Sequence, residues 1–353
     1  MLYSVTTEHL IVSPADPDAG VLEKAARVLR RGGLVAFPTE TVYGLGADGL
    51  NARAVARIYA AKGRPADNPL ILHIAKAADL PLLAREITPV ARTLTAEFWP
   101  GPLTVILPKT PVVPPEVTCG LDTVAVRCPA SEVALKLIEL AQTPVAAPSA
   151  NASGRPSPTD AAAVLADLAG RVEIVLDAGP CAIGVESTVV DCTGPVPVLL
   201  RPGGLTAEEI REAAGEIIVA AGPGLSEGEK APRSPGMKYV HYAPAAPLVL
   251  VEWSPGAEAA LLARIGAELA AGRRVGAVVS AETARLLPAA VKAAVYGRRG
   301  AMAAAAANLF AALRHYDAEP VDIIYAEGTS EAGLGLAVMN RLRKAARQIL
   351  RPD

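Results

Sequence analysis

The sequence predicts an α/β fold arranged as two domains joined by a linker. Short apolar segments alternate, along nearly the whole chain, with longer segments whose apolar residues recur at helical spacing. The length of 353 residues exceeds that of an ordinary single domain. A stretch rich in glycine, proline and charge interrupts the alternation and shows no apolar period. We therefore expect a first domain over residues 1–215, a linker over 216–245 and a second domain over 246–353.

Composition and charge indicate a cytoplasmic globular protein. Hydrophobic residues make up 51% of the chain, and the net charge of -2 gives no overall attraction to nucleic acid or membrane. The N-terminus lacks a basic region followed by an apolar core, and the uncharged stretch Ala301–Leu313 is too short to span a bilayer. No two cysteines are spaced as C-x-x-C, so free thiols in a reducing compartment are expected rather than zinc or another bound metal. The cysteines are Cys119, Cys128, Cys181 and Cys192.

The most informative stretch begins with a buried strand. Leu34–Phe37 is apolar, and Thr39, Thr41 and Tyr43 follow at alternate positions. If the strand continues through them, all three hydroxyls face one side. This alternation cannot choose between Thr39 and Thr41 as the residue that contacts a ligand.

A glycine turn, a helix and a basic loop are predicted to follow. Gly44 and Gly46 are expected to break the strand. A helix should begin after Asn51, which is a good N-cap residue, and end at Lys62. Lys62 and Arg64 then place two cations on one short loop near the row of hydroxyls. This arrangement suits an anion with several oxygens.

The same glycines match the dinucleotide fingerprint G-x-G-x-x-G between Gly44 and Gly49. A dinucleotide fold also needs an acidic residue about 20 positions later, at the end of the second strand. The second strand is predicted at Leu70–Ile74 and runs into Ala75 and Lys76. An ordinary glycine turn is therefore favoured over a nicotinamide or flavin site.

The remaining elements follow from the two periodicities in order. In the first domain, an edge strand is expected within residues 1–17, and helices over Val21–Arg31, Pro89–Phe98, Glu132–Gln142 and Thr206–Ala214. Strands are expected over Leu103–Leu107, Thr123–Cys128, Glu173–Asp177, Gly184–Asp191 and Val198–Arg201. In the second domain, strands are expected over Leu248–Val251, Val275–Val279, Ala294–Tyr296 and Val321–Tyr325. Its helices are expected over Gly256–Ala271, Ala281–Ala290, Ala301–Tyr316 and Leu336–Leu350.

Two polar residues interrupt apolar strands of the first domain. His73 is either an ordinary core residue or a residue that faces the same cleft as the basic loop. Arg127 is either an edge residue with a solvated head or a residue that holds a carboxylate through two hydrogen bonds.

A second polar group follows the strand near residue 145. Ser149 and Asn151 lie two residues apart, and Ser157 is predicted to cap a helix whose first residue is Pro158. One interpretation is an ordinary loop and a capped helix. The other is that hydroxyls, an amide and a helix N-terminus converge on an anion such as a phosphate. Further along, the aromatic cluster at Met237–Tyr242 suggests that the linker packs over a cleft.

Six segments, in one order, resemble the threonylcarbamoyl-AMP synthases and their YrdC-like catalytic domain. They read AFPTETVYGLG, KGRPADNPLILHI, WPGPLTVIL, VAVRCP, PSAN and ESTVVD. SPGMKYVHYAPAAPL and GLGLAVMNRL resemble the linker and the appended domain of the longer members. The resemblance implies a YrdC-like twisted mixed sheet with helices and a concave basic cleft. It also implies a small Rossmann-like C-terminal domain.

The resemblance also implies a reaction. L-threonine, bicarbonate and ATP give threonylcarbamoyl-AMP and pyrophosphate, and other proteins then transfer the threonylcarbamoyl group to the adenosine beside the anticodon of certain tRNAs. Such a step needs alignment and cations rather than a protein nucleophile. Mg²⁺ would arrive with ATP and be held mainly by the triphosphate, with no tightly bound organic cofactor.

The family's roles carry over to two groups of residues, in which Lys62 and Arg64 are the catalytic ones. ATP would be bound by Lys62, Arg64, Asn68, Thr123, Ser149, Asn151, Ser157, Arg201 and His241. L-threonine would be bound by Thr39 or Thr41, with Thr41 favoured, and by His73, Arg127 and Ser187. Arg127 would pair with the threonine carboxylate, and His241 would make the linker a lid over the nucleotide.

Two other functions compete with the synthase. A YrdC-like module that binds RNA without catalysis is opposed by the net charge of -2 and by the lack of aromatic residues for base stacking. A carbamoyl-transfer maturation enzyme with a related domain would be expected to carry cysteine-rich zinc motifs. The four cysteines of this chain do not form such motifs.

Overall fold

The computed structural model describes residues 5–220 and 241–352, which form two compact units. The first unit contains residues 5–153, 158–182 and 186–220, and the second contains 154–157, 183–185 and 241–352. Most of the predicted linker, including the cluster Met237–Tyr242 up to residue 240, lies outside the described residues. The predicted boundaries at residues 215 and 245 therefore stay a prediction.

The first unit is built on a mixed sheet of eleven strands in the order β1-β8-β2-β3-β7-β4-β6-β5-β9-β10-β11. The predicted α/β class is confirmed, and β1 is an edge strand as expected. Parallel and antiparallel pairs alternate through the centre, since β4 is parallel to β6, β6 antiparallel to β5, and β5 parallel to β9. The strands are β1 Glu8–Ile11, β2 Val35–Phe37, β3 Gly44–Asp48, β4 Ile71–His73, β5 Leu103–Pro108, β6 Thr123–Arg127, β7 Val145–Ala146, β8 Ile174–Asp177, β9 Thr188–Asp191, β10 Val198–Arg201 and β11 Ile218–Val219.

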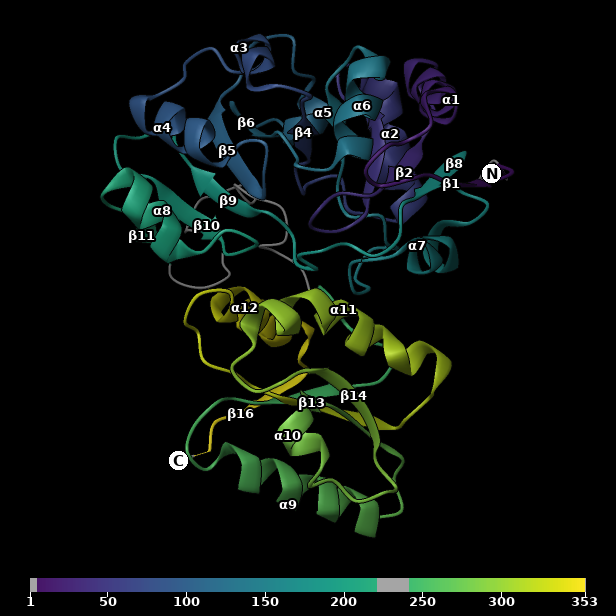
Figure 1. The fold of residues 1–353 in the computed structure, drawn as a ribbon, viewed down its shortest axis with the longest axis vertical. Helices are drawn as coiled ribbons and strands as arrows, with labels where there is room; N and C mark the ends of the chain where they lie inside the picture. Colours follow the sequence, from purple (N-terminus) through teal and green to yellow (C-terminus); the bar gives the residue numbers. More distant parts are fainter. Residues whose placement is uncertain (1–4, 221–240, 353) are drawn as a thin grey trace. The chain divides into compact units, whose positions relative to one another are not determined.

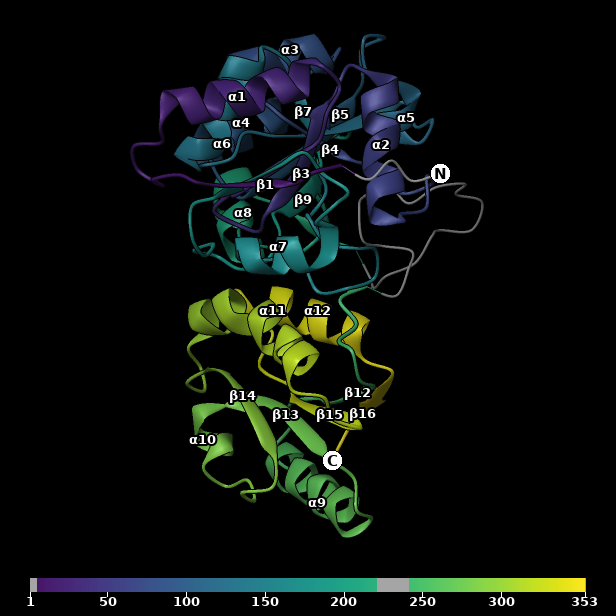
Figure 2. The same cartoon turned by 90° about the vertical axis from the view of Figure 1, so that its right-hand side faces the viewer.

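Helices cover both faces of this sheet. The view in Figure 2 places α1, α4 and α6 on one side of the strands and α2 and α5 on the other. On the first side, Leu22 and Leu29 of α1 and Leu137 of α6 pack with Phe37 and Ile174 in one buried apolar cluster. The helices are α1 Ala19–Arg30, α2 Ala52–Lys62, α3 Leu80–Leu83, α4 Pro89–Phe98, α5 Pro115–Thr118, α6 Glu132–Ala141, α7 Ala161–Leu168 and α8 Ala207–Ala214, with a 3₁₀ turn at Ala77–Asp79.

Local signals explain why α2 and α4 match their predictions. The Asn51 side chain accepts hydrogen bonds from two backbone N–H groups of the first turn of α2, and Gly63 ends the helix with φ of +62°. Thr88 caps α4 in the same way, and Pro89 occupies its first position. Caps of this kind fix helix ends without help from distant residues.

The predicted strand through Thr39, Thr41 and Tyr43 is wrong. β2 ends at Phe37, residues 38–43 form a loop, and Gly44 begins the antiparallel strand β3. Gly44 and Gly46 therefore lie inside a strand instead of breaking one. A Cβ atom at Gly46 would lie 2.8 Å from the Phe37 ring and 2.9 Å from Cγ1 of Val145. Close packing between neighbouring strands, which the sequence does not reveal, accounts for the glycine.

The predicted capping role of Ser157 is also wrong. α7 begins at Ala161, and its N-cap is Asp160, whose carboxylate accepts a hydrogen bond of 2.8 Å from the N–H of Ala163. Both Ser157 and Asp160 precede a helical pattern, and Asp160 is the equally good cap that lies nearer to it. The Asp160 carboxylate thus takes the capping position at the N-terminus of α7 that was predicted for Ser157.

The second unit is a small doubly wound α/β domain, as predicted. Its five strands are all parallel, in the order β14-β13-β15-β12-β16, with α9 and α10 on one face and α11 and α12 on the other (Figure 1). The strands are β12 Leu248–Val251, β13 Val275–Ser280, β14 Lys292–Gly297, β15 Ile323–Glu327 and β16 Gln348–Leu350. The helices are α9 Ala257–Ala270, α10 Ala281–Ala284, α11 Met302–Ala318 and α12 Gly335–Ala345.

Two helices of this unit are shorter than predicted. α10 ends at Ala284, and Pro288 cannot donate the backbone hydrogen bond that a longer helix would need. The predicted helix Leu336–Leu350 ends at Ala345, and its last residues form β16 alongside β12. Pairing with a distant strand outweighs local helix propensity there.

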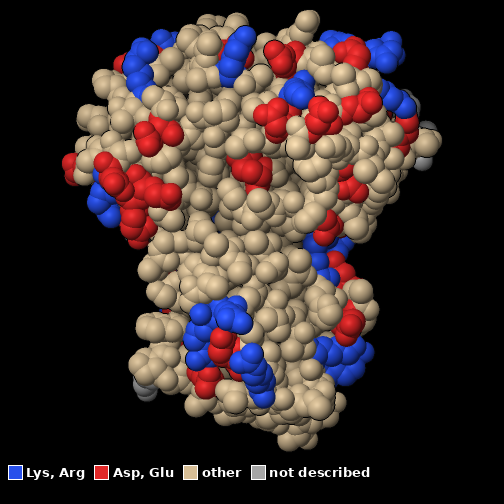
Figure 3. Space-filling view, in the orientation of Figure 1, with Lys and Arg blue, Asp and Glu red and all other residues tan. Residues whose placement is uncertain are grey.

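Charges of both signs are interspersed on the face of the molecule shown in Figure 3. In the second unit, Arg343 forms two ion pairs, at 2.7 Å to Glu252 and 2.5 Å to Glu331. Within the part of the chain that the structure describes, no helix is both long enough and apolar enough to cross a membrane.

Candidate active site

Five residues at one end of the central strands of the first sheet lie in a row. His73 of β4 is opposite Arg127 of β6, and Arg127 is opposite Thr104 of β5. Thr104 is opposite Val189 of β9, which pairs with Arg201 of β10. Opposed residues on neighbouring strands bring their side chains close together. We call His73, Arg127, Thr104, Val189 and Arg201 the strand row.

The Arg127 guanidinium is buried and held from three directions. Its Nη1 donates to Oγ1 of Thr41 at 2.9 Å, and its Nε donates to the carbonyl oxygen of Gly101 at 3.2 Å. Its Nη2 lies 2.7 Å from Oε1 of Glu40 in an ion pair. Arginine presents a planar set of donors that matches a carboxylate, so a fixed, buried guanidinium suits recognition of one.

The loop over residues 38–43 places two hydroxyls near this guanidinium, one behind the other. Oγ1 of Thr39 donates to the carbonyl oxygen of Val42 at 2.7 Å and lies 2.8 Å from Oγ1 of Thr41. Because the Thr39 proton is used on Val42, Thr41 is the donor between the two hydroxyls. Thr41 therefore contacts Arg127 directly, and Thr39 lies one hydroxyl further away.

His73 is a neutral, buried imidazole next to Arg127. Burial, and then the positive charge of Arg127, lower the pKa of His73 to about 3. The ring packs edge-on against Phe37, with centroids 6.3 Å apart. Among the described residues, Nδ1 of His73 has no hydrogen-bond partner. A buried ring nitrogen in this state is available to a ligand.

Ser187 links two members of the strand row, Thr104 and Arg201. Its Oγ lies 2.8 Å from Oγ1 of Thr104 and 3.2 Å from Nη2 of Arg201. Arg201 also donates to the carbonyl oxygen of Ser187 from Nε at 3.2 Å and from Nη2 at 2.9 Å. The turn after Arg201 passes close by, since a Cβ atom at Gly203 would lie 2.2 Å from the carbonyl oxygen of Glu186.

Lys62, Ser149 and Asn151, three predicted ATP ligands, are brought together at the end of α2. The buried Lys62 Nζ donates to the carbonyl oxygens of Ser149 and Asn151, the latter at 2.6 Å, and lies 3.3 Å from Oδ1 of Asn151. Oγ of Ser149 donates to the same Oδ1 at 2.6 Å. Lys62 thus fixes the shape of the polar segment that follows β7.

The loop after α2 holds another predicted ligand, Asn68, in a buried position. Arg64 Nη2 donates to the carbonyl oxygens of Asn68 and Pro69 at 3.1 and 3.2 Å. The Asn68 side chain is buried, and within the described residues neither its amide nitrogen nor its amide oxygen has a hydrogen-bond partner. Burying an amide without a partner is unfavourable, which points to a ligand that completes its hydrogen bonds.

The other predicted ligands are Thr123 in the first unit and Ser157 and His241 in the second. Thr123 begins β6, at the other end of that strand from Arg127. Ser157 and His241 belong to the second unit. There the His241 ring lies 5.6 Å from the ring of Tyr242, which packs on Phe310 at 5.1 Å. No described contact tests the predicted ATP roles of these three residues.

Glu40 and Thr104 belong to the site although the sequence did not single them out. Glu40 stands between two predicted ligands, and Thr104 lies within the segment WPGPLTVIL. Only the position between Thr39 and Thr41 could have indicated Glu40. Strand register, which motifs do not reveal, brings Thr104 to Arg127 and Ser187.

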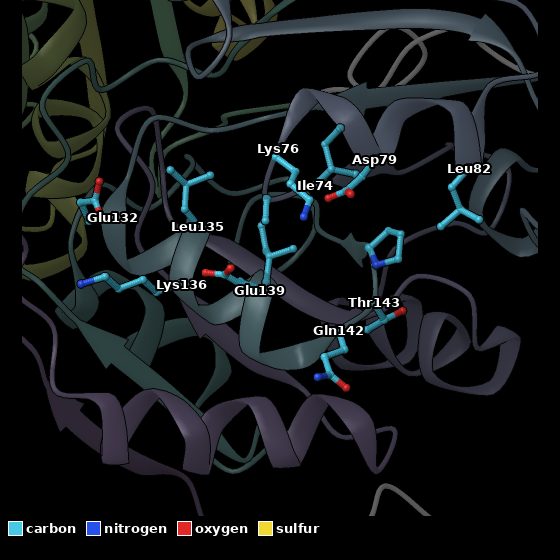
Figure 4. Close-up of a pocket in the computed structure, with 13 residues that line it drawn as sticks. Ile74, Lys76, Asp79, Leu82, Glu132, Leu135, Lys136, Glu139, Gln142 and Thr143 are labelled. Carbon is cyan, nitrogen blue, oxygen red and sulfur yellow. The ribbon is translucent and has the colours of Figure 1, made fainter.

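A groove elsewhere on the first unit does not include any predicted ligand. It has a volume of about 520 Å³ and lies between α6 and the segment after β4. Figure 4 shows Lys76 and Asp79 on one wall and Leu135 and Glu139 of α6 on the other. In residues 5–220 and 241–352, no three His, Cys, Asp or Glu side chains are grouped so as to hold a metal ion.

Comparison with known proteins identifies relatives of the whole chain. A family model described as "Telomere recombination" matches residues 27–203, and one described as "Threonylcarbamoyl-AMP synthase, C-terminal domain" matches residues 205–347. The threonylcarbamoyl-AMP synthase of Pyrococcus abyssi is 52% identical over 91% of this chain and 93% of its own length. That of Bacillus subtilis is 50% identical over 95% of this chain and 94% of its own length.

A solved structure agrees with both the fold and the length. The crystal structure of Pyrococcus abyssi Sua5 complexed with L-threonine matches with a TM-score of 0.92 and 49% sequence identity. The match covers 98% of this chain and 100% of that one. The relatives are thus similar to this chain in sequence, in fold and in the presence of a second domain.

Proposed function

The chain belongs to the threonylcarbamoyl-AMP synthase family, and on this premise we propose how its residues carry out the reaction. The chain is an enzyme that makes threonylcarbamoyl-AMP, in the manner of nucleotidyltransferases that use ATP. Its fold is the mixed α/β fold of this family, with the family's C-terminal domain. We propose that bicarbonate is the carbon source and that pyrophosphate is the second product.

The observation that carries the proposal is the buried Arg127 in the strand row. Its guanidinium would bind the threonine carboxylate, with Thr41 or Thr39 beside it. The hydroxyl of Ser187 and the neutral ring of His73 would contact the rest of the amino acid. A relative 49% identical to this chain was crystallised with L-threonine, which supports a threonine site in this fold.

ATP would bind around the end of α2. Lys62 and Arg64 would supply positive charge and Asn68 its unpartnered amide, while Ser149 and Asn151 would contribute polar groups from the adjoining segment. Arg201, which holds Ser187, would connect the phosphates to the threonine site. Thr123, Ser157 and His241 complete the proposed set by resemblance to the family.

The chemistry requires alignment more than reactive side chains. The threonine nitrogen forms a bond to the carbon of bicarbonate, water leaves, and a carbamate results. A carbamate oxygen then attacks the α-phosphorus of ATP, and pyrophosphate leaves with the electron pair of the broken P–O bond. Mg²⁺, carried by the triphosphate, would neutralise phosphate charge when bound.

The wider context is proposed on the same grounds. The enzyme would act in the cytoplasm and supply threonylcarbamoyl-AMP to proteins that modify tRNA. Residues 1–215 would form the catalytic domain, 216–245 a linker that closes over ATP through His241, and 246–353 a C-terminal domain. Comparing the turnover of the full chain with that of a chain ending at residue 215 would test this division.

The first experiment measures pyrophosphate release by the purified protein, with threonine and bicarbonate omitted in turn. We expect release to require both, and Lys62→Ala or Arg64→Ala to abolish it. The exposed Lys76 serves as the matched control, and Lys76→Ala should leave release unchanged. Release that ignores threonine would indicate a different nucleotidyl transfer. RNA binding without any release would favour the non-catalytic module.

A further inference from the structure

Glu40 is a carboxylate enclosed by the proposed threonine site. Its side chain is 13% exposed, and both of its oxygens are shielded from solvent. Neither oxygen has a well-aligned hydrogen bond to any described residue, and the contact that compensates its charge is the ion pair with Nη2 of Arg127. A buried carboxylate with so few partners is unfavourable unless a ligand adds to them.

The contacts of Arg127 determine what a ligand meets on arrival. Nη1 and Nε are already used on Thr41 and Gly101, and Nη2 lies against Glu40. A carboxylate that reaches Nη2 therefore comes close to the negative charge of Glu40. A simple carboxylic acid would be repelled by that charge. An α-amino acid would not, because it carries a positive ammonium group on the carbon next to its carboxylate.

Of the side chains that contact Arg127 in the described part of the chain, Glu40 is the one whose charge is opposite to that of the ammonium. His73 is neutral at physiological pH, and the hydroxyls of Thr39 and Thr41 are engaged with Val42 and Arg127. Next to Arg127 itself, an ammonium group would meet a like charge. Glu40 supplies the opposite charge within 2.7 Å of the same guanidinium.

We propose that Glu40 binds the α-ammonium group of L-threonine while Arg127 binds its carboxylate. The two protein charges and the two charges of the zwitterion would then alternate in sign around the site. This assignment rests on the proposed threonine site and adds a specificity-determining residue to it. Glu40 would select α-amino acids over hydroxy acids and fix the nitrogen that forms the new bond to carbon.

The test compares two ligands by calorimetry, L-threonine and (R)-3-hydroxybutanoate, which is the same molecule without its amino group. They are titrated into the full-length wild type, Glu40→Gln and Glu40→Asp. Glu97→Gln, an exposed carboxylate on α4, is the control for loss of one negative charge. Thermal unfolding of each variant shows whether it is folded.

Opposite responses of the two ligands are the expected result. Glu40→Gln should lower the affinity for L-threonine by about 10- to 100-fold, the range for a hydrogen bond to a charged group. Its affinity for (R)-3-hydroxybutanoate should stay the same or rise, because the repelling charge has gone. Glu40→Asp should bind L-threonine more tightly than Glu40→Gln does, and Glu97→Gln should behave as the wild type.

Two results would overturn the assignment. An equal loss of affinity for both ligands would mean that Glu40 only holds Arg127 in place, and no change for either would mean that it does not act. If Glu40→Gln does not fold, Glu40→Asp must itself weaken L-threonine more than the hydroxy acid relative to wild type. Separately, L-threonine binding that survives Arg127→Gln would contradict the proposed threonine site rather than the role of Glu40.

Discussion

Arg201 donates two hydrogen bonds to the carbonyl oxygen of Ser187, at 3.2 Å from Nε and 2.9 Å from Nη2. The first of these residues is a proposed ATP ligand and the second a proposed threonine ligand, so one buried guanidinium joins the two parts of the site. Ser187 immediately precedes β9, and Arg201 ends the antiparallel neighbour β10, which brings the two residues together.

Arg201→Lys should therefore weaken both substrates. A lysine ammonium cannot reproduce two hydrogen bonds in the plane of a guanidinium, so we expect the affinities for ATP and L-threonine each to fall at least 10-fold. Ser187→Ala should weaken L-threonine and leave ATP within about twofold. Calorimetry with each ligand measures this, with the exposed Arg211→Lys as the control. A loss confined to ATP would show that Arg201 does not position Ser187.

Lys62 should be needed for the shape of the segment after β7 as well as for charge. Lys62→Met keeps the length of the side chain and removes the donor, which leaves two buried carbonyl oxygens without it. We expect the free energy of unfolding to fall by about 1–3 kcal/mol and ATP binding to be lost. Urea denaturation and calorimetry provide the two measurements. Lys76→Met is the control, and a variant that keeps wild-type ATP affinity would contradict the role.

Stability should decrease in acid because of His73. The pKa of His73 is about 3 in the folded protein and about 6.5 when the chain is unfolded, so the unfolded state takes up the proton more readily. The contribution of neutral His73 to the free energy of unfolding is fully present above pH 6.5 and is lost as the pH falls toward 3. From pH 7 to pH 4.5 this group alone should lower the free energy of unfolding by about 2.5 kcal/mol.

His73→Gln removes this proton uptake, so its stability should fall less over the same pH range, by about that amount. Denaturant unfolding at a series of pH values provides the comparison. His315→Gln, at a partly exposed position, is the control and should keep the wild-type slope. Parallel curves for wild type and His73→Gln would show that the imidazole is not buried as described.

Gly203→Ala should disturb Ser187 without touching any ligand directly. The added methyl group would lie 2.2 to 2.5 Å from backbone atoms of Glu186, Ser187 and Thr188, so the start of β9 must shift. We expect a loss of about 1–3 kcal/mol in the free energy of unfolding and a weaker affinity for L-threonine. Gly194→Ala is the matched control, because its Cβ would meet nothing closer than 4.0 Å. Equal effects of the two substitutions would contradict the clash.

Much of the fold could be predicted because its signals are local. Asn51 and Thr88 cap helices whose first residues were predicted within one position, and the alternation of strand and helix identified the C-terminal domain. Two failures occurred where distant residues decide. Phe37 and Val145 require a glycine inside β3, and β12 recruits Gln348–Leu350 from a helical pattern.

The site was predicted in part, because some of its residues belong to local motifs. Motif residues such as Lys62 and Ser149 do meet, and His73 and Arg127 lie opposite one another. The strand thought to carry Thr39 and Thr41 is a loop, since the Thr39 hydroxyl bonds to Val42 and closes a turn. Side chains of Ser, Thr and Asn compete with strands in this way, and alternation alone does not detect it.

The strand row has a consequence for how the enzyme folds. Its members are separated by up to more than a hundred positions along the chain, from His73 to Arg201. Only Val189 and Arg201 lie on consecutive antiparallel strands with a short connection, β9 and β10. Such a site has high contact order, and it exists only when the centre of the sheet has assembled as a whole. Amino acid bound there would stabilise the assembled sheet and no partly folded form of it. Bound substrate would thus stabilise the fully folded first unit, and substrate affinity would measure how much of the protein is fully folded.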